Sequence, residues 1–157
     1  MRRFVTCLSL ALLLSGCGEK TDSQLTTEAQ KSVKQKLAKE YKPGECEKWL
    51  YMESAGVIKS GASKLACDNE FNVNKGVTFS DIRIYRHESY STVCGKVSGY
   101  TDIGTIDGKF VFSDKNDGSV FIKKSKYRAL QHNDDKNSIN INDIIERQFE
   151  LESRDCQ

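Results

Sequence analysis

The feature that most constrains the fold is a two-residue alternation of apolar and polar side chains within residues 82–123. Its apolar members are Ile82, Ile84, Val93, Val97, Phe110, Phe112, Val120 and Ile122. Successive side chains of a strand point to opposite sheet faces, so this pattern predicts half-buried strands. Polar segments at residues 87–89 and 113–118 have the composition of turns. We therefore predict a four-stranded antiparallel meander with one aliphatic and aromatic face.

One predicted helix precedes the alternating region and another follows it. Thr27 and Gln30 have the spacing of a capping box, and Pro43-Gly44 ends the helix. Its apolar stripe consists of Ala29, Val33, Leu37 and Tyr41. The second helix is expected to begin at Asn142 or Asp143, and one of its sides carries Ile144, Ile145, Gln148 and Phe149. With both helices on one face of the sheet, the chain is a single small α+β domain over residues 27–157.

Between Cys46 and Cys67 the sequence has no clear period. It contains the dense apolar cluster Trp49-Leu50-Tyr51-Met52. We expect this cluster to form a short helical turn that packs over the core.

The N-terminus has the organisation of a secretory signal. Arg2 and Arg3 precede an apolar run over residues 4–14, which is too short to cross a bilayer. The following Leu14-Ser15-Gly16-Cys17 resembles the lipobox of bacterial lipoproteins. The resemblance implies that residues 1–16 are removed, that the Cys17 thiol receives a diacylglyceryl group, and that its freed amine is acylated as well. Two or three acyl chains anchor a protein far more firmly than one.

Residues 17–26 are polar and without periodicity, so we expect the lipidated cysteine and a flexible tether there. Gly18 stands where an Asp would retain a lipoprotein in the inner membrane. The resemblance therefore implies an outer-membrane anchor with the domain in the periplasm, and surface exposure is the alternative.

Removal of the signal leaves Cys46, Cys67, Cys94 and Cys156 besides the lipidated Cys17. An even number of cysteines in an oxidising compartment, with no Cys-x-x-Cys pair, predicts two structural disulfides. Four cysteines allow three pairings. We favour Cys46 with Cys67, which closes a local loop, and Cys94 with Cys156, which ties a strand to the C-terminal tail.

The charge of the mature chain is balanced. The full sequence has 24 Lys+Arg and 22 Asp+Glu, and two arginines leave with the signal, so 24 − 2 = 22 basic residues face 22 acidic ones. Basic residues gather only at Lys123, Lys124 and Lys126. We expect no nucleic-acid partner.

Few residues offer catalytic or metal-binding chemistry. His87 and His132 are the available bases near neutral pH, and each falls in a polar turn where we expect a solvated ring. The sequence contains no nucleophile elbow, phosphate loop or zinc-protease motif. The acidic stretch 114–118 lacks the further spaced ligands and the distal Glu of a calcium loop, and a hairpin turn explains it. The adjacent residues 132–135 rarely converge on one ion, and a solvated loop explains them. We predict no enzyme activity, no cofactor and no metal.

The strand region carries a second resemblance. Seven residues are similar to a group of small, uncharacterised exported bacterial proteins with a Val-Cys-Gly-x-Val strand between aromatic strands. These residues are Phe79, Val93, Cys94, Gly95, Val97, Gly108 and Phe110. The resemblance implies export and lends no activity.

These observations favour a membrane-anchored module that binds another envelope protein, of the inhibitor, immunity or exclusion type. A structural accessory subunit of an envelope assembly is the alternative, and a hydrolase is the third interpretation. We expect the partner to bind the sheet face that the helices leave open. The candidate contact residues there are Arg83, Tyr85, Tyr100 and Phe121.

Overall fold

A computed structural model describes residues 19–115, 118–127 and 136–157 of the chain, and the side chains of 136–142 are outside that description. The sheet consists of β1 (Val77–Arg86), β2 (Ser91–Tyr100), β3 (Thr105–Ser113) and β4 (Ser119–Lys124). All neighbours are antiparallel, in the order β1-β2-β3-β4. The predicted α+β class and four-stranded meander are confirmed.

β1 contains a bulge that changes which residues face the core. Ser80 pairs with Lys96 and Arg83 pairs with Cys94, so β1 has two residues where β2 has only Gly95. The extra residue keeps Phe79 and Ile82 on one face although three positions separate them. Asp81, at the bulge, has a φ of 53°, in the left-handed region that few residues other than glycine adopt.

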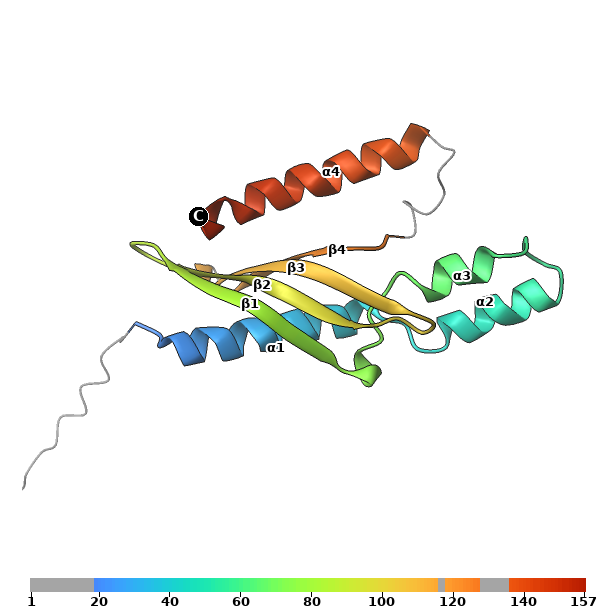
Figure 1. Cartoon of the computed structure of the whole chain (residues 1–157), viewed down its shortest axis with the longest axis horizontal. Helices are drawn as coiled ribbons and strands as arrows, with labels where there is room; N and C mark the ends of the chain where they lie inside the picture. The colour runs from blue at the N-terminus through green and yellow to red at the C-terminus, as the bar shows by residue number, and fades with distance from the viewer. Residues whose placement is uncertain (1–18, 116–117, 128–135) are drawn as a thin grey trace, which may run out of the picture.

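Helix α1 (Asp22–Glu40) covers one face of the sheet (Figure 1). Its fully buried side chains Leu25, Ala29, Val33 and Leu37 pack with Val93, Val97, Ile106, Phe110 and Phe112 from the strands. The predicted start and tether boundary were wrong. The capping box is formed by Thr21 and Gln24, and Leu25, which we placed in the tether, belongs to the core.

The C-terminal helix α4 (Lys136–Glu152) lies on the opposite face of the sheet, followed by the short 3-10 helix η4 (Ser153–Cys156) (Figure 1). The prediction that both helices share a face was wrong. Phe121 contacts Phe149 of α4, and Phe121 alternates with the core residues Val120 and Ile122. The helix begins six or seven residues before the predicted caps Asn142 and Asp143, which lie inside it.

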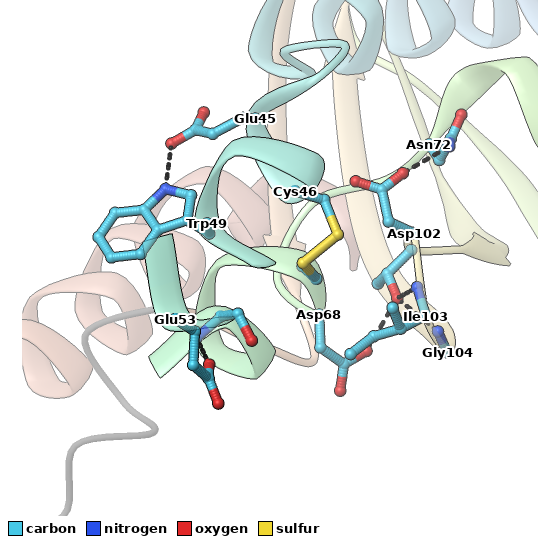
Figure 2. The surroundings of a disulfide bond; sticks show 12 residues. Glu45, Cys46, Trp49, Glu53, Asp68, Asn72, Asp102, Ile103 and Gly104 are labelled. Atoms are coloured by element: carbon cyan, nitrogen blue, oxygen red, sulfur yellow. Dashed lines mark hydrogen bonds between the residues drawn. A yellow bond between two sulfur atoms is a disulfide. The ribbon is translucent and has the colours of Figure 1, made fainter. Parts of the chain in front are cut away.

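Helices α2 (Glu45–Ser54) and α3 (Ala62–Cys67) extend beyond one end of the sheet (Figure 1). We expected the 49–52 cluster to pack over the core, and this was wrong. Tyr51 is 73% exposed and Leu50 is 49% exposed. The pair is held by the Cys46–Cys67 disulfide and by Glu53, whose carboxylate accepts hydrogen bonds from the amides of Gly61 and Ser63 at the start of α3 (Figure 2).

A polar cluster fixes the loop between β2 and β3. The buried Thr101 donates its hydroxyl proton to Asp68 over 2.8 Å, and the same hydroxyl accepts from the amides of Ile103 and Gly104 (Figure 2). Lys126 donates to both carboxylate oxygens of Asp68. Burial raises the pKa of Asp68, but the hydrogen bonds from Lys126 and Thr101 outweigh it and the pKa is lowered.

Within the described residues, no helix is both long and apolar enough to span a membrane. The second predicted disulfide, Cys94–Cys156, is also confirmed, and it joins β2 to η4.

Candidate functional site

The sheet face opposite α1 is only partly covered by α4 and η4, and a groove of about 520 Å³ remains between them and β1–β3. Strands supply most of its floor, so its side chains stand on rigid backbone. The charged and aromatic residues that line the groove are Asp81, Arg83, Tyr85, Lys96, Lys109, Phe110 and Phe149.

Positive charge dominates these side chains. The ammonium of Lys96 lies 2.7 Å from the Asp81 carboxylate, and its hydrogen bond lowers the pKa of Asp81. Arg83 and Lys109 form no ion pair with any described residue. Lys96 and Lys109 stand directly opposite each other on β2 and β3. Like charges in that position repel each other, and the Asp81 carboxylate already offsets the charge of Lys96, so Lys109 and Arg83 are the groove cations left without an ion pair among the described residues.

The Cys94–Cys156 disulfide forms part of the groove lining. Cys94 lies on β2 opposite Arg83, and Cys156 lies in η4. The bond therefore fixes the C-terminal wall of the groove against its floor. Tyr90 adds a hydrogen bond of 2.9 Å to Asp155, and this bond raises the pKa of Tyr90.

Helix α4 closes the β4 side of the groove through a small set of contacts. The rings of Phe121 and Phe149 lie 6.1 Å apart. Lys123 lies over the Phe149 ring and also pairs with Glu146 at 2.5 Å. Phe149 thus serves both as a packing residue and as a wall of the groove.

The structure divides the four predicted contact residues. Arg83 and Tyr85 line the groove as predicted from their alternation. Phe121 lies on the same face but packs on Phe149 beneath α4. Tyr100 is exposed at the far end of β2, where it lines a separate hollow with Val77 and Asp107.

His87 differs from the solvated ring that we predicted. Its imidazole stacks on Tyr90 with ring centroids 4.4 Å apart, and its Nε2 is buried without a hydrogen-bond partner among the described residues. It lies in the β1–β2 turn and is not among the residues that line the groove. His132 lies outside the described residues.

The described part of the acidic turn after β3 has a structural role. The carboxylate of Asp114 accepts a hydrogen bond from the Ser91 amide, and Asn116 and Asp117 lie outside the description. No group of three or more His, Cys, Asp or Glu side chains in the described parts of the chain is arranged to hold a metal ion.

The predicted alternation placed Arg83 and Tyr85 in the groove, but the sequence analysis missed two features of this site. The Asp81 bulge is signalled by the three-residue step from Phe79 to Ile82, which interrupts the alternation. The groove wall at Phe149 had no local signal, because it depends on which face α4 covers. Comparison of the chain with protein-family models, curated proteins and solved structures found no match.

Proposed function

We propose that this chain is a lipid-anchored envelope protein that binds a partner protein through the groove on the sheet. The proposed anchor rests on the lipobox-like Leu14-Ser15-Gly16-Cys17. Two disulfides fit an oxidising compartment outside the cytoplasm. The outer membrane with a periplasmic domain is the location that we propose, and the partner is an envelope protein.

The observation that carries the binding function is a groove beside Phe149 that is lined by exposed Arg83 and half-buried Tyr85 on β1 and by exposed Lys109 on β3. Arg and Tyr contribute strongly to protein interfaces because each combines a large contact area with polar groups. Hydrogen bonds and a disulfide already fix the strand backbone that carries these side chains. The loss of backbone entropy on binding is therefore small.

Site-specific photo-crosslinking in intact cells tests this function. p-Benzoylphenylalanine replaces Tyr85 in the groove, and in a matched control it replaces the exposed Lys31 on α1. We expect one discrete adduct from position 85, absent from position 31 and lost when Arg83→Glu is added. If the protein with the crosslinker at position 85 is recovered only as the monomer, the proposal that the groove is the binding site is contradicted.

One observation favours the accessory-subunit alternative. The α2–α3 pair carries the exposed apolar residues Leu50, Tyr51 and Val57 away from the core, as a docking element of an assembly does. The same crosslinker at Tyr51 separates the two functions. An adduct from position 51 without one from position 85 would favour the structural role.

A further inference from the structure

We infer that the groove binds an extended acidic segment of the partner, with carboxylates on alternate residues. This inference rests on the proposed binding function and specifies the chemistry of the partner. It follows from the sign, the spacing and the surroundings of the groove charges.

The sign of the charge is unbalanced. Three cationic side chains, Arg83, Lys96 and Lys109, face one acidic side chain, Asp81, which leaves a side-chain charge of 3 − 1 = +2. Asp81 is already engaged by Lys96. Lys109 has no ion pair among the described residues, so a carboxylate placed beside it neutralises an unpaired cation and also lies near Lys96, which stands opposite on β2.

The spacing of the charges matches an extended chain. Arg83 is level with Cys94, and the Lys96–Lys109 pair is two residues further along β2. Two residues of a strand span about 6.6–6.8 Å, which is also the repeat of side chains on one side of an extended peptide. A segment with acidic residues at positions i and i+2 therefore brings one carboxylate to each level.

The surroundings favour a peptide over a lone phosphate. The cations come from three strands at two levels, so their charge is spread along the groove instead of converging on one small anion. Tyr85, Val111 and Phe149 line the space between and beside them. Aromatic and aliphatic walls of this kind bury the carbon atoms of a peptide, which an inorganic anion lacks.

Selection from a random library tests the inference even while the partner is unidentified. A phage-displayed library of random twelve-residue peptides is panned on the full-length protein in detergent micelles at low salt. We expect at least a fivefold enrichment of Asp and Glu, with pairs at i and i+2 over-represented. The Arg83→Glu/Lys109→Glu variant should lose this enrichment and select Lys and Arg instead.

The matched control is Lys31→Glu/Lys48→Glu, which makes the same change in net charge at exposed positions on α1 and α2. It should select the same acidic peptides as the unmodified protein, and both variants should unfold at the unmodified temperature. Selection without acidic bias, or acidic bias that survives the groove variant, would overturn the inference. Inorganic phosphate that binds in calorimetry and is lost in the groove variant would replace it with a phosphate site.

The two proposals fail separately. If position 85 gives a discrete adduct in cells but the selected peptides show no acidic enrichment, the binding function stands and the acidic segment is rejected. If the selected peptides are acidic but position 85 gives no adduct in cells, the preference of the groove for acidic peptides stands and the envelope partner is rejected.

Discussion

Asp68 connects three segments that are distant in the sequence. Asp68 directly follows α3. Its carboxylate accepts hydrogen bonds from Thr101 in the β2–β3 loop and from Lys126 beyond β4. We expect Asp68→Asn to lower the free energy of unfolding by about 1–3 kcal/mol, because charge-assisted hydrogen bonds are lost. Urea denaturation at pH 7 measures the change. Asp143→Asn, at an exposed position on α4, should be neutral, and equal losses in the two variants would contradict the role of the cluster.

The same carboxylate predicts a pH dependence. Its pKa in the folded state is lowered from 3.8, so its stabilising contribution is fully present above that value. The contribution is lost as the pH falls through the lower folded pKa. Asp68→Asn should therefore flatten the acid limb of the stability curve below about pH 4 while leaving its slope above pH 5 unchanged. An unchanged acid limb would refute the assignment.

Gly95 is required by the packing of an aromatic side chain. A Cβ at this position would lie 2.9 Å from the Phe110 ring and 3.2 Å from the Ser80 carbonyl oxygen. Phe110 also meets Phe79 edge to face, with centroids 5.8 Å apart. Three residues of the Val-Cys-Gly-x-Val resemblance, Phe79, Gly95 and Phe110, thus form one packing unit in the core.

We expect Gly95→Ala to destabilise the protein by about 1–3 kcal/mol, the usual cost of overpacking a core. Thermal unfolding measures the loss. Ser98→Ala, on the same strand but the opposite face, should change little. A fully stable Gly95→Ala variant would mean that the Phe110 ring moves aside at no cost.

At the scale of elements, α1 and α4 are held to the sheet in different ways, and the Cys94–Cys156 disulfide ties η4, which directly follows α4, to β2. Four buried side chains hold α1, whereas the described contacts of α4 with the sheet centre on Phe149 and Glu146. We expect Cys94→Ser/Cys156→Ser to cost about 2–4 kcal/mol. Amide hydrogen exchange should quicken in residues 143–156 while α1 stays protected.

The other bridge provides the control for this prediction. Cys46 and Cys67 are 21 residues apart, against 62 for Cys94 and Cys156. Chain entropy alone makes the longer loop the more stabilising bridge, by about 1 kcal/mol. Cys46→Ser/Cys67→Ser should loosen α2 and α3 and leave α4 protected. Fast exchange of α1 in either variant would show that the elements unfold together.

Most elements of the fold could be predicted because their patterns are local. Strand alternation, the turns between strands and the presence of two disulfides followed from residue type and spacing, whereas the confirmed pairings were a preference among the three that four cysteines allow. The start of α1 was missed because Thr21-Gln24 and Thr27-Gln30 have the same capping spacing. Leu25 distinguishes the two capping boxes. It lies one turn before Ala29 on the same buried stripe as Ala29 and Val33, so the helix must begin before it.

Two placements could not be predicted from local patterns. An amphipathic helix such as α4 shows that one side is buried, but its own sequence does not say against which sheet face. The neighbours Phe121 and Val111, which point away from the α1 face, were the available signal. The 49–52 cluster has four consecutive large side chains and no period, so nothing in it indicated that Leu50 and Tyr51 remain exposed.

For the whole molecule, the central prediction concerns the anchor. Cys17→Ala removes the thiol that the lipobox resemblance assigns to acylation. We expect the variant to remain an uncleaved precursor that incorporates no labelled palmitate, while wild type incorporates it. Cys46→Ser is the matched control and should be processed normally. Normal maturation of Cys17→Ala would refute the lipoprotein assignment.

The ion pairs at the start of α1 limit how far an anchored domain can travel. Arg86 contacts Glu19, the Lys20 carbonyl and Asp22 together, so ordered structure begins within two residues of Cys17. Two residues span at most about 7 Å, which leaves almost no slack between the proposed lipid and the sheet. A domain held so close to its anchor moves along the membrane surface and cannot move far from it. Under the proposed anchor, a partner would meet the domain within a few tens of ångströms of the bilayer, about the diameter of the domain itself.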